Sequence, residues 1–129
     1  MQDVKLVDAI NDAIGAHGMW KLRLRTAIAQ GHSDITAAKA GCDDGCAFGQ
    51  WLYGGSIPAA VKAGVPYGVI RRLHAEFHQS AGSVLAYVES KDVPKARQLL
   101  EGEFTQRSEK LVRALTKWKH EAGAVSRAA

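Results

Sequence analysis

Two histidines lie one helical turn apart in the segment LHAEFH, at His74 and His78. On a helix, residues four positions apart are separated by only about 40° around the axis, so both imidazoles can reach one ion. His17 and Cys46 lie on other apolar segments and offer a third imidazole and a thiolate. Three imidazoles and one thiolate are a donor set that tetrahedral zinc sites use. The sequence therefore predicts a zinc site formed by His17, Cys46, His74 and His78.

Each of these four residues also has an ordinary interpretation. A histidine on an apolar face is often a core residue with a satisfied hydrogen bond, and a single cysteine there is often a small buried hydrophobe. The chain has only five histidines and two cysteines, yet four of these seven residues lie on faces that point inward. This coincidence favours the metal site over four unrelated packing roles.

A zinc hydrolase is the nearest alternative, and the spacing disfavours it. The H-E-x-x-H motif needs a glutamate directly after the first histidine, whereas Glu76 follows His74 by two positions and lies about 200° around the helix. Four protein ligands also leave no open position for a reactive water. A di-iron bundle would need Glu-x-x-His pairs, and none accompanies these histidines. We therefore expect no enzymatic activity, although a metal-dependent enzyme stays an alternative to test.

The first element that positions this site is a predicted helix over residues 4–29. Its inward stripe advances in steps of three and four residues, and His17 and Lys21 fill positions of this series between the apolar members. The apolar members are Ile10, Ile14, Leu24 and Ile28. Gly31 ends the helix, and a polar connection follows.

A predicted short helix over residues 45–53 carries Cys46. Asp43 or Asp44 is suited to cap it, and Gly54 follows its last turn. One of the two aspartates could instead accept a hydrogen bond from a ligand imidazole. Gly49 lies on the face of Cys46, where a small residue permits close approach.

Two further long helices are predicted. The first begins near Pro66, runs to about Glu89 and carries both histidines of LHAEFH. Its stripe is Ile70, Leu73, His74, Phe77, His78, Ala81, Leu85 and Val88. The second is capped by Asp92 and spans residues 93 to about 120. Its stripe is Ala96, Leu100, Phe104, Leu111, Leu115 and Trp118.

These elements predict an all-α fold, an antiparallel four-helix bundle with three long helices and a short helix in the connection between the first and third. The 129 residues are expected to form one domain. Two cysteines cannot form a disulfide framework, and the N-terminus does not resemble a secretory signal, so a reducing, cytoplasmic location is expected. No window is apolar enough for a membrane span. The net charge of +4 comes from basic residues spread along every segment, which indicates a solvated surface and not nucleic-acid binding.

The motifs HGMWKLRL, CAFGQWLYG and LHAEFH resemble the chemoreceptor zinc-binding domain, or CZB, family. The combination of Cys-x-x-Gly-x-Trp-Leu with a downstream His-x3-His is the specific part, and the separations between the four donors are similar to those in the family. The resemblance implies zinc ligand roles for His17, Cys46, His74 and His78. It also implies a bacterial cytoplasmic sensor, often a homodimer, associated with chemoreceptors or with diguanylate cyclases.

The family is implicated in zinc-responsive control of cyclic-di-GMP synthesis and in sensing hypochlorous acid through the zinc-bound cysteine. Zinc would hold Cys46 as a thiolate, which is the form of sulfur that reacts with oxidants. Oxidation to sulfenic acid would weaken this donor and release the short helix. Because the sequence carries no receptor module or cyclase, we expect a signal to pass to a separate partner or to remain within a homodimer. The alternative is a structural or dimerisation bundle in which zinc only supports the fold.

Several nearby residues receive weaker assignments. Cys42 could resolve an oxidised Cys46 as a disulfide, but an ordinary loop thiol is the favoured interpretation, because a disulfide needs a specific Cα spacing. Trp20 and Trp51 are expected to pack around the site. His32 and His120 are assigned no role.

Overall fold

The computed structural model describes residues 2–128, and side chains are described for residues 6–122. Every regular element in this range is a helix, which confirms the predicted all-α class. The helices are α1 Gln2–Gly18, α2 Trp20–Gln30, α3 Ala37–Ala40, α4 Ala47–Tyr53, α5 Ala59–Lys62, α6 Val65–Glu89, α7 Val93–Leu99, the π-helical turn η1 Leu100–Phe104 and α8 Thr105–Ala128.

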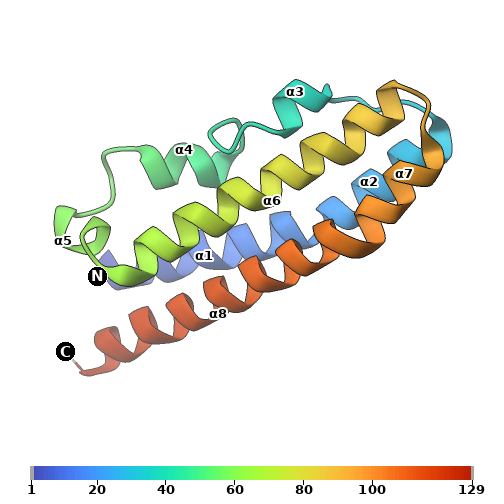
Figure 1. Ribbon diagram of the computed structural model, residues 1–129. Coiled ribbons are helices and arrows are strands. Elements are labelled where there is room, and N and C mark those ends of the chain that lie inside the picture. The colour runs from blue at the N-terminus through green and yellow to red at the C-terminus, as the bar shows by residue number, and fades with distance from the viewer. Residues whose placement is uncertain (1, 129) are drawn as a thin grey trace.

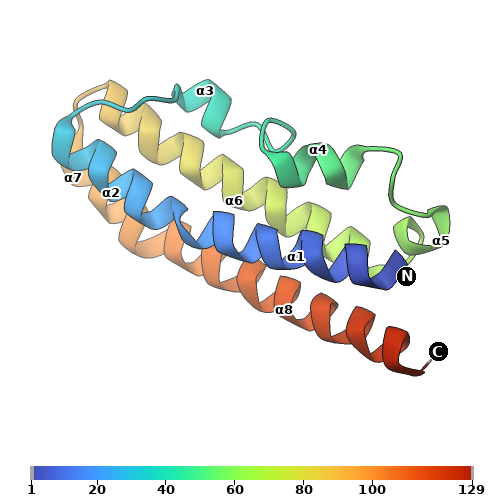
Figure 2. The ribbon, with the colours of Figure 1, turned by 180° about the vertical axis from the view of Figure 1, so that it is seen from behind.

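Three long rods form a helical bundle (Figures 1 and 2). The first rod consists of α1 and α2, the second is α6, and the third consists of α7, η1 and α8. The first two rods run in the same direction and the third runs back, so that α8 packs on both α1 and α6. On the side opposite α8, α3 and α4 lie above the first two rods, and α3 packs directly on α6. None of the described helices combines the length and apolar character of a membrane span.

The first rod is two helices, and the prediction of one uninterrupted helix over residues 4–29 is wrong in this respect. The helix is interrupted at Met19, directly after Gly18, which has low helix propensity, although Met19 keeps right-handed dihedral angles (φ of −80°, ψ of −14°). The break leaves His17 and Trp20 both buried, at 2% and 8% exposure. The predicted end at Gly31 is confirmed, because this residue adopts the left-handed conformation with φ of 79°.

The start of α4 also differs from the prediction. Neither Asp43 nor Asp44 caps this helix, which begins at Ala47 with Cys46 as its N-cap. The backbone N–H of Gly49 donates to Cys46 Sγ over 3.3 Å, so the sulfur takes the place that a carboxylate oxygen would fill. The predicted stop at Gly54 is confirmed. The short helices α3 and α5 occupy segments that the sequence pattern assigned to connections.

The second and third rods follow their predicted bounds closely. Pro66 lies in the first turn of α6, which ends at Glu89, and the Asp92 carboxylate caps α7 by accepting from the backbone N–H of Lys95 over 3.2 Å. The third rod continues to Ala128, beyond the predicted end near residue 120. Its π-turn η1 was not predicted. Leu100 and Phe104, the first and last residues of this turn, are both buried in the core.

The core is formed by the predicted stripes. Most of their members are buried, whereas Ile14 and Leu73 are only partly buried. The rings of Phe77 in α6 and Phe104 in η1 pack with centroids 5.1 Å apart. This contact places the core between the second and third rods directly beside the two histidines of α6.

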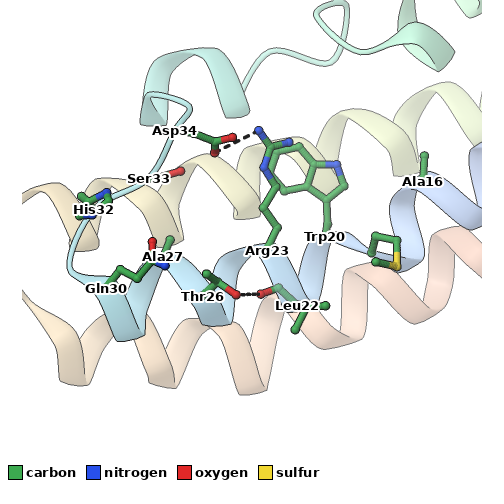
Figure 3. A pocket seen from close by; sticks show the side chains of 11 residues that line it. Ala16, Trp20, Leu22, Arg23, Thr26, Ala27, Gln30, His32, Ser33 and Asp34 are labelled. Carbon is green, nitrogen blue, oxygen red and sulfur yellow. Dashed lines mark hydrogen bonds and ion pairs between the residues drawn. The ribbon is translucent and has the colours of Figure 1, made fainter.

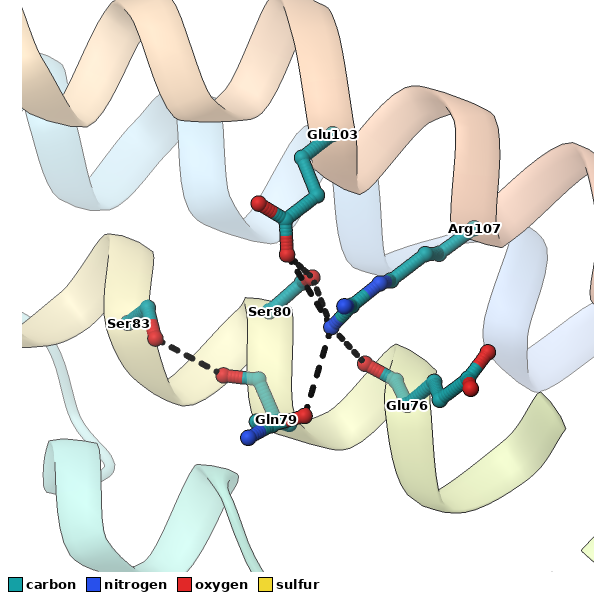
Figure 4. Close-up of polar contacts among 6 residues, drawn as sticks. All are labelled: Glu76, Gln79, Ser80, Ser83, Glu103 and Arg107. Atoms are coloured by element: carbon teal, nitrogen blue, oxygen red, sulfur yellow. Dashed lines mark hydrogen bonds and ion pairs between the residues drawn. The ribbon is translucent and has the colours of Figure 1, made fainter. Parts of the chain in front are cut away.

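A polar cluster joins the same two rods at their surface (Figure 4). Arg107 of α8 donates to the backbone carbonyl of Glu76 over 3.0 Å and to the buried hydroxyl of Ser80 over 2.9 Å. The same guanidinium pairs with Glu103 at 3.0 Å, and Ser80 donates to that carboxylate over 3.1 Å. Arg107 therefore contacts α6 at one residue between His74 and His78 and at a second residue just after His78.

Candidate metal centre

The four predicted donor residues come from three separate segments. His17 lies in the last turn of α1, Cys46 is the N-cap of α4, and His74 and His78 lie one turn apart in the middle of α6. One donor atom from each lies within 4.8 Å of the donor atoms of all the others. The three histidines are at most 2% exposed, whereas Cys46 is partly buried. The structure thus brings together all four residues named from the sequence.

Three of the six distances between these donors are close to those around a tetrahedral zinc ion. His17 Nε2 and His74 Nε2 are 3.1 Å apart, and Cys46 Sγ lies 3.3 Å from His74 Nε2 and 3.5 Å from His78 Nε2. Zinc bonds of about 2.0–2.1 Å to nitrogen and 2.3 Å to sulfur imply edges of about 3.3 Å between nitrogens and 3.6 Å between nitrogen and sulfur. These three donor pairs are therefore spaced as in a zinc coordination sphere, and the remaining pairs lie within 4.8 Å.

Backbone carbonyls orient two of the imidazoles. His17 Nδ1 donates to the carbonyl of Ala13 over 2.7 Å, and His78 Nδ1 donates to the carbonyl of Ala40 over 3.0 Å. A neutral imidazole with its proton on Nδ1 has a lone pair on Nε2. Both Nε2 atoms are therefore acceptors aimed at the centre of the cluster, as a metal ligand requires. His74 Nδ1 is buried and has no hydrogen-bond partner among the described residues, so its proton is not fixed in the same way.

Burial also sets the charge of these groups. Desolvation lowers the pKa of His17 to about 4 and that of His74 to about 2, and it lowers the pKa of His78 in the same direction. All three rings are neutral near pH 7, which is the metal-binding form. Burial raises the pKa of the Cys46 thiol. A cation in the cluster would oppose this shift, since a coordinating thiol is deprotonated by its metal.

Aromatic rings surround the donors. The His17 ring lies 5.0 Å from the Phe77 ring and 5.8 Å from the Phe48 ring, measured between centroids. Trp20 lies 5.8 Å from His78, and Trp51 packs on Phe48 at 5.6 Å. Both tryptophans thus have the packing positions expected from the sequence. These rings give the site an apolar wall.

A groove of about 670 Å³ runs along α2 on the far side of Trp20 (Figure 3). Met19, Leu22 and Thr26 line it, and the ion pair between Arg23 and Asp34, 3.3 Å long, lies at its rim. None of the four donors lines this groove. The donor cluster and the groove are therefore separate features that share Trp20 as a wall.

The remaining residues near the motif have other contacts. The Asp43 carboxylate accepts from the Tyr53 hydroxyl, and the imidazoles of His17 and His78 donate to backbone carbonyls and not to Asp43 or Asp44. Cys42 is exposed, and its thiol donates to the carbonyl of Ala38 over 3.3 Å. The disulfide with Cys46 stays a hypothesis, and the ordinary loop thiol stays the favoured interpretation. Sequence reasoning missed the two carbonyls that orient the rings, because a backbone acceptor leaves no residue-type signal.

A family model described as the chemoreceptor zinc-binding domain matches residues 17–85, a range that covers more than half of the chain and includes all four donors. The chain belongs to this family. No curated protein sequence and no solved structure gave a significant match. Chemoreceptor zinc-binding domains bind zinc, so the predicted cofactor is confirmed. The family is a regulatory, sensory one and not a known family of enzymes, and this domain is accordingly a zinc-binding signalling module.

Proposed function

We propose that His17, Cys46, His74 and His78 bind one zinc ion and that the domain is a cytoplasmic sensor. In this sensor, the Cys46 thiolate is the donor that the stimulus changes. One observation supports this best. Backbone carbonyls accept the Nδ1 protons of His17 and His78, so the Nε2 lone pairs of both rings point toward the other donor atoms, and all four donors lie within 4.8 Å of one another. Zinc would supply a positive charge that holds the sulfur as a thiolate.

Cys46 differs from the three histidines in ways that suit a switch. It is the one donor of the four that is partly exposed, and it starts a short helix, whereas the histidines belong to long, well-packed rods. Reaction with hypochlorous acid converts the thiolate and HOCl to a sulfenic acid and chloride, with no further reactant. The sulfenic acid is a weaker donor, so the link from Cys46 through the ion to the histidines of α6 would weaken.

Zinc level is the second stimulus that the same site supports. Loss of the ion would also detach Cys46 from the histidines, without oxidation of the sulfur.

We further propose that residues 1–129 form one domain and that α3 and α4 together are the fourth member of an antiparallel four-helix bundle. The domain would act as a homodimer or on a separate signalling protein of a chemoreceptor or diguanylate cyclase pathway.

A purely structural zinc site is the competing proposal, because closed sites with four protein ligands are usual in structural zinc domains. The test uses purified wild type and Cys46→Ala. Plasma mass spectrometry should find one zinc per wild-type chain, and mild hypochlorite should release it while circular dichroism shows that the helices persist. Unfolding on chelation would favour the structural role, and a wild type purified without stoichiometric zinc would refute the ligand assignment.

A further inference from the structure

The one-turn helix α3 connects the surface of the domain to a proposed zinc ligand. Its last residue, Ala40, is 1% exposed and accepts the hydrogen bond of His78 Nδ1 over 3.0 Å. This bond is made between segments 38 residues apart in the chain, so it exists only while α3 is docked on α6. The orientation of His78 therefore depends on what holds α3 in place.

Gly82 permits this docking. A Cβ atom at Gly82 would lie 2.8 Å from Gly41 Cα and 3.0 Å from both the Gly41 nitrogen and the Ala37 carbonyl oxygen. All three are backbone atoms of α3 and its C-cap, so they cannot swing aside as a flexible side chain would. Gly82 is buried in the interior of a 25-residue helix, a place where glycine is intrinsically unfavourable. A close backbone approach gives the physical reason for a glycine there.

The opposite end of α3 is held by α6 as well. The backbone N–H of Ala37 donates to the Glu89 carboxylate over 2.8 Å. His78, Gly82 and Glu89 follow one another at intervals of four and seven residues, so they lie along one side of α6. Along this stripe, the Glu89 carboxylate contacts the first residue of α3, Gly82 lies against the backbone of α3, and the His78 ring contacts its last residue.

We propose that Gly82 is a positioning residue for zinc, acting through α3 on His78. The proposal rests on the zinc ligand role of His78 given above. With α3 docked, the Ala40 carbonyl keeps the His78 proton on Nδ1 and the lone pair on Nε2 directed at the site. A side chain at residue 82 lifts α3, removes this acceptor and leaves the imidazole free to rotate and change tautomer. Hydrogen bonds of this kind to a ligand histidine are typically worth about 10–100-fold in metal affinity.

The test compares Gly82→Ala with Gly68→Ala in the full chain. Both positions lie in α6, but a Cβ at Gly68 meets nothing within 4 Å. Competition with a chromophoric chelator should show zinc binding weakened about 10–100-fold in Gly82→Ala and unchanged in Gly68→Ala. Glu89→Ala removes the acceptor for the first residue of α3 without adding volume, so it should also weaken zinc binding. This second variant keeps the test decisive if Gly82→Ala fails to fold.

A second measurement does not need zinc. Nitrogen-15 NMR of the zinc-free protein should show His78 protonated on Nδ1 in wild type and in Gly68→Ala, and a mixture of tautomers in Gly82→Ala. Unchanged zinc affinity and an unchanged His78 tautomer in Gly82→Ala would overturn the proposal. If wild type bound no zinc, the ligand assignment would fail, whereas the tautomer measurement would still decide whether Gly82 controls His78.

Discussion

His17 Nε2 and His74 Nε2 face each other across 3.1 Å in the buried core. His17 carries its proton on Nδ1 and donates it to the Ala13 carbonyl, so its Nε2 has a lone pair. The space between the two Nε2 atoms can therefore hold either a cation or one proton carried by His74. In the zinc-free protein, a proton on His74 Nε2 makes this contact a hydrogen bond. Zinc and this proton therefore exclude each other, and a zinc-loaded site has to leave the proton of His74 on Nδ1.

The stability of the zinc-free protein should fall as the pH is lowered from 6.5. In the unfolded chain the histidines have a pKa near 6.5, whereas the folded pKa of His17 is about 4 and that of His74 about 2. Between these values the unfolded state binds protons that the folded state does not, so the free energy of unfolding should drop by roughly 1.4 kcal/mol per pH unit for each buried histidine. Urea denaturation at pH 7.0, 6.0 and 5.0 measures this slope. His17→Gln should reduce it, and a flat profile in wild type would contradict the burial of neutral rings.

Replacing His74 with alanine should abolish tight zinc binding. His74 Nε2 is within 3.3 Å of both His17 Nε2 and Cys46 Sγ, so it occupies the middle of the donor cluster. Loss of a direct ligand should cost more affinity than the roughly 10–100-fold attributed to a supporting hydrogen bond. The matched control is His32→Ala, which removes an exposed imidazole in the connection after α2. Equal zinc affinity of the two variants in chelator competition would rule out the ligand role of His74.

Gly49→Ala should destabilise the domain and displace Cys46. A Cβ at Gly49 would overlap the carbonyl oxygen of Asp43, and the backbone N–H of Gly49 itself donates to Cys46 Sγ. Overpacking against backbone costs about 1–3 kcal/mol. Gly55→Ala, where nothing lies within 4 Å, is the control and should leave the thermal midpoint nearly unchanged. A normal midpoint and a normal zinc content in Gly49→Ala would show that the loop before α4 can move aside.

Arg107→Met should weaken the attachment of the third rod to α6. The variant removes the donor to the Glu76 carbonyl and to Ser80, and it leaves the Glu103 carboxylate without its cation. A loss of about 1–3 kcal/mol in the free energy of unfolding is expected. Arg113→Met is the control, because its ion pair with Glu109 is exposed at 77% and 63% and should contribute less than about 0.5 kcal/mol. Denaturant titration of both variants compares the two, and equal losses would show that the cluster in Figure 4 adds nothing specific.

The sequence was sufficient to predict the helical class, the ends at Gly31 and Glu89, the cap at Asp92 and the convergence of four donors. These features depend on residue type and helical period, which the sequence displays directly. The features it did not reveal depend on the backbone. The cap by Cys46 replaces an oxygen with a sulfur, η1 changes the helical period for one turn, and the acceptors of His17 and His78 are main-chain carbonyls.

The order of the donors along the chain has a consequence for the unfolded state. Cys46 follows His17 by 29 residues and precedes His74 by 28, so a single ion would close two loops of nearly equal length, as a pair of crosslinks would. Closing such loops lowers the conformational entropy of the unfolded chain. The third rod begins after His78 and lies outside both loops. Zinc would therefore directly restrain residues 17–78, about half of the chain, whereas α8 is attached by side-chain packing and, among its described side chains, by the polar contacts of Arg107.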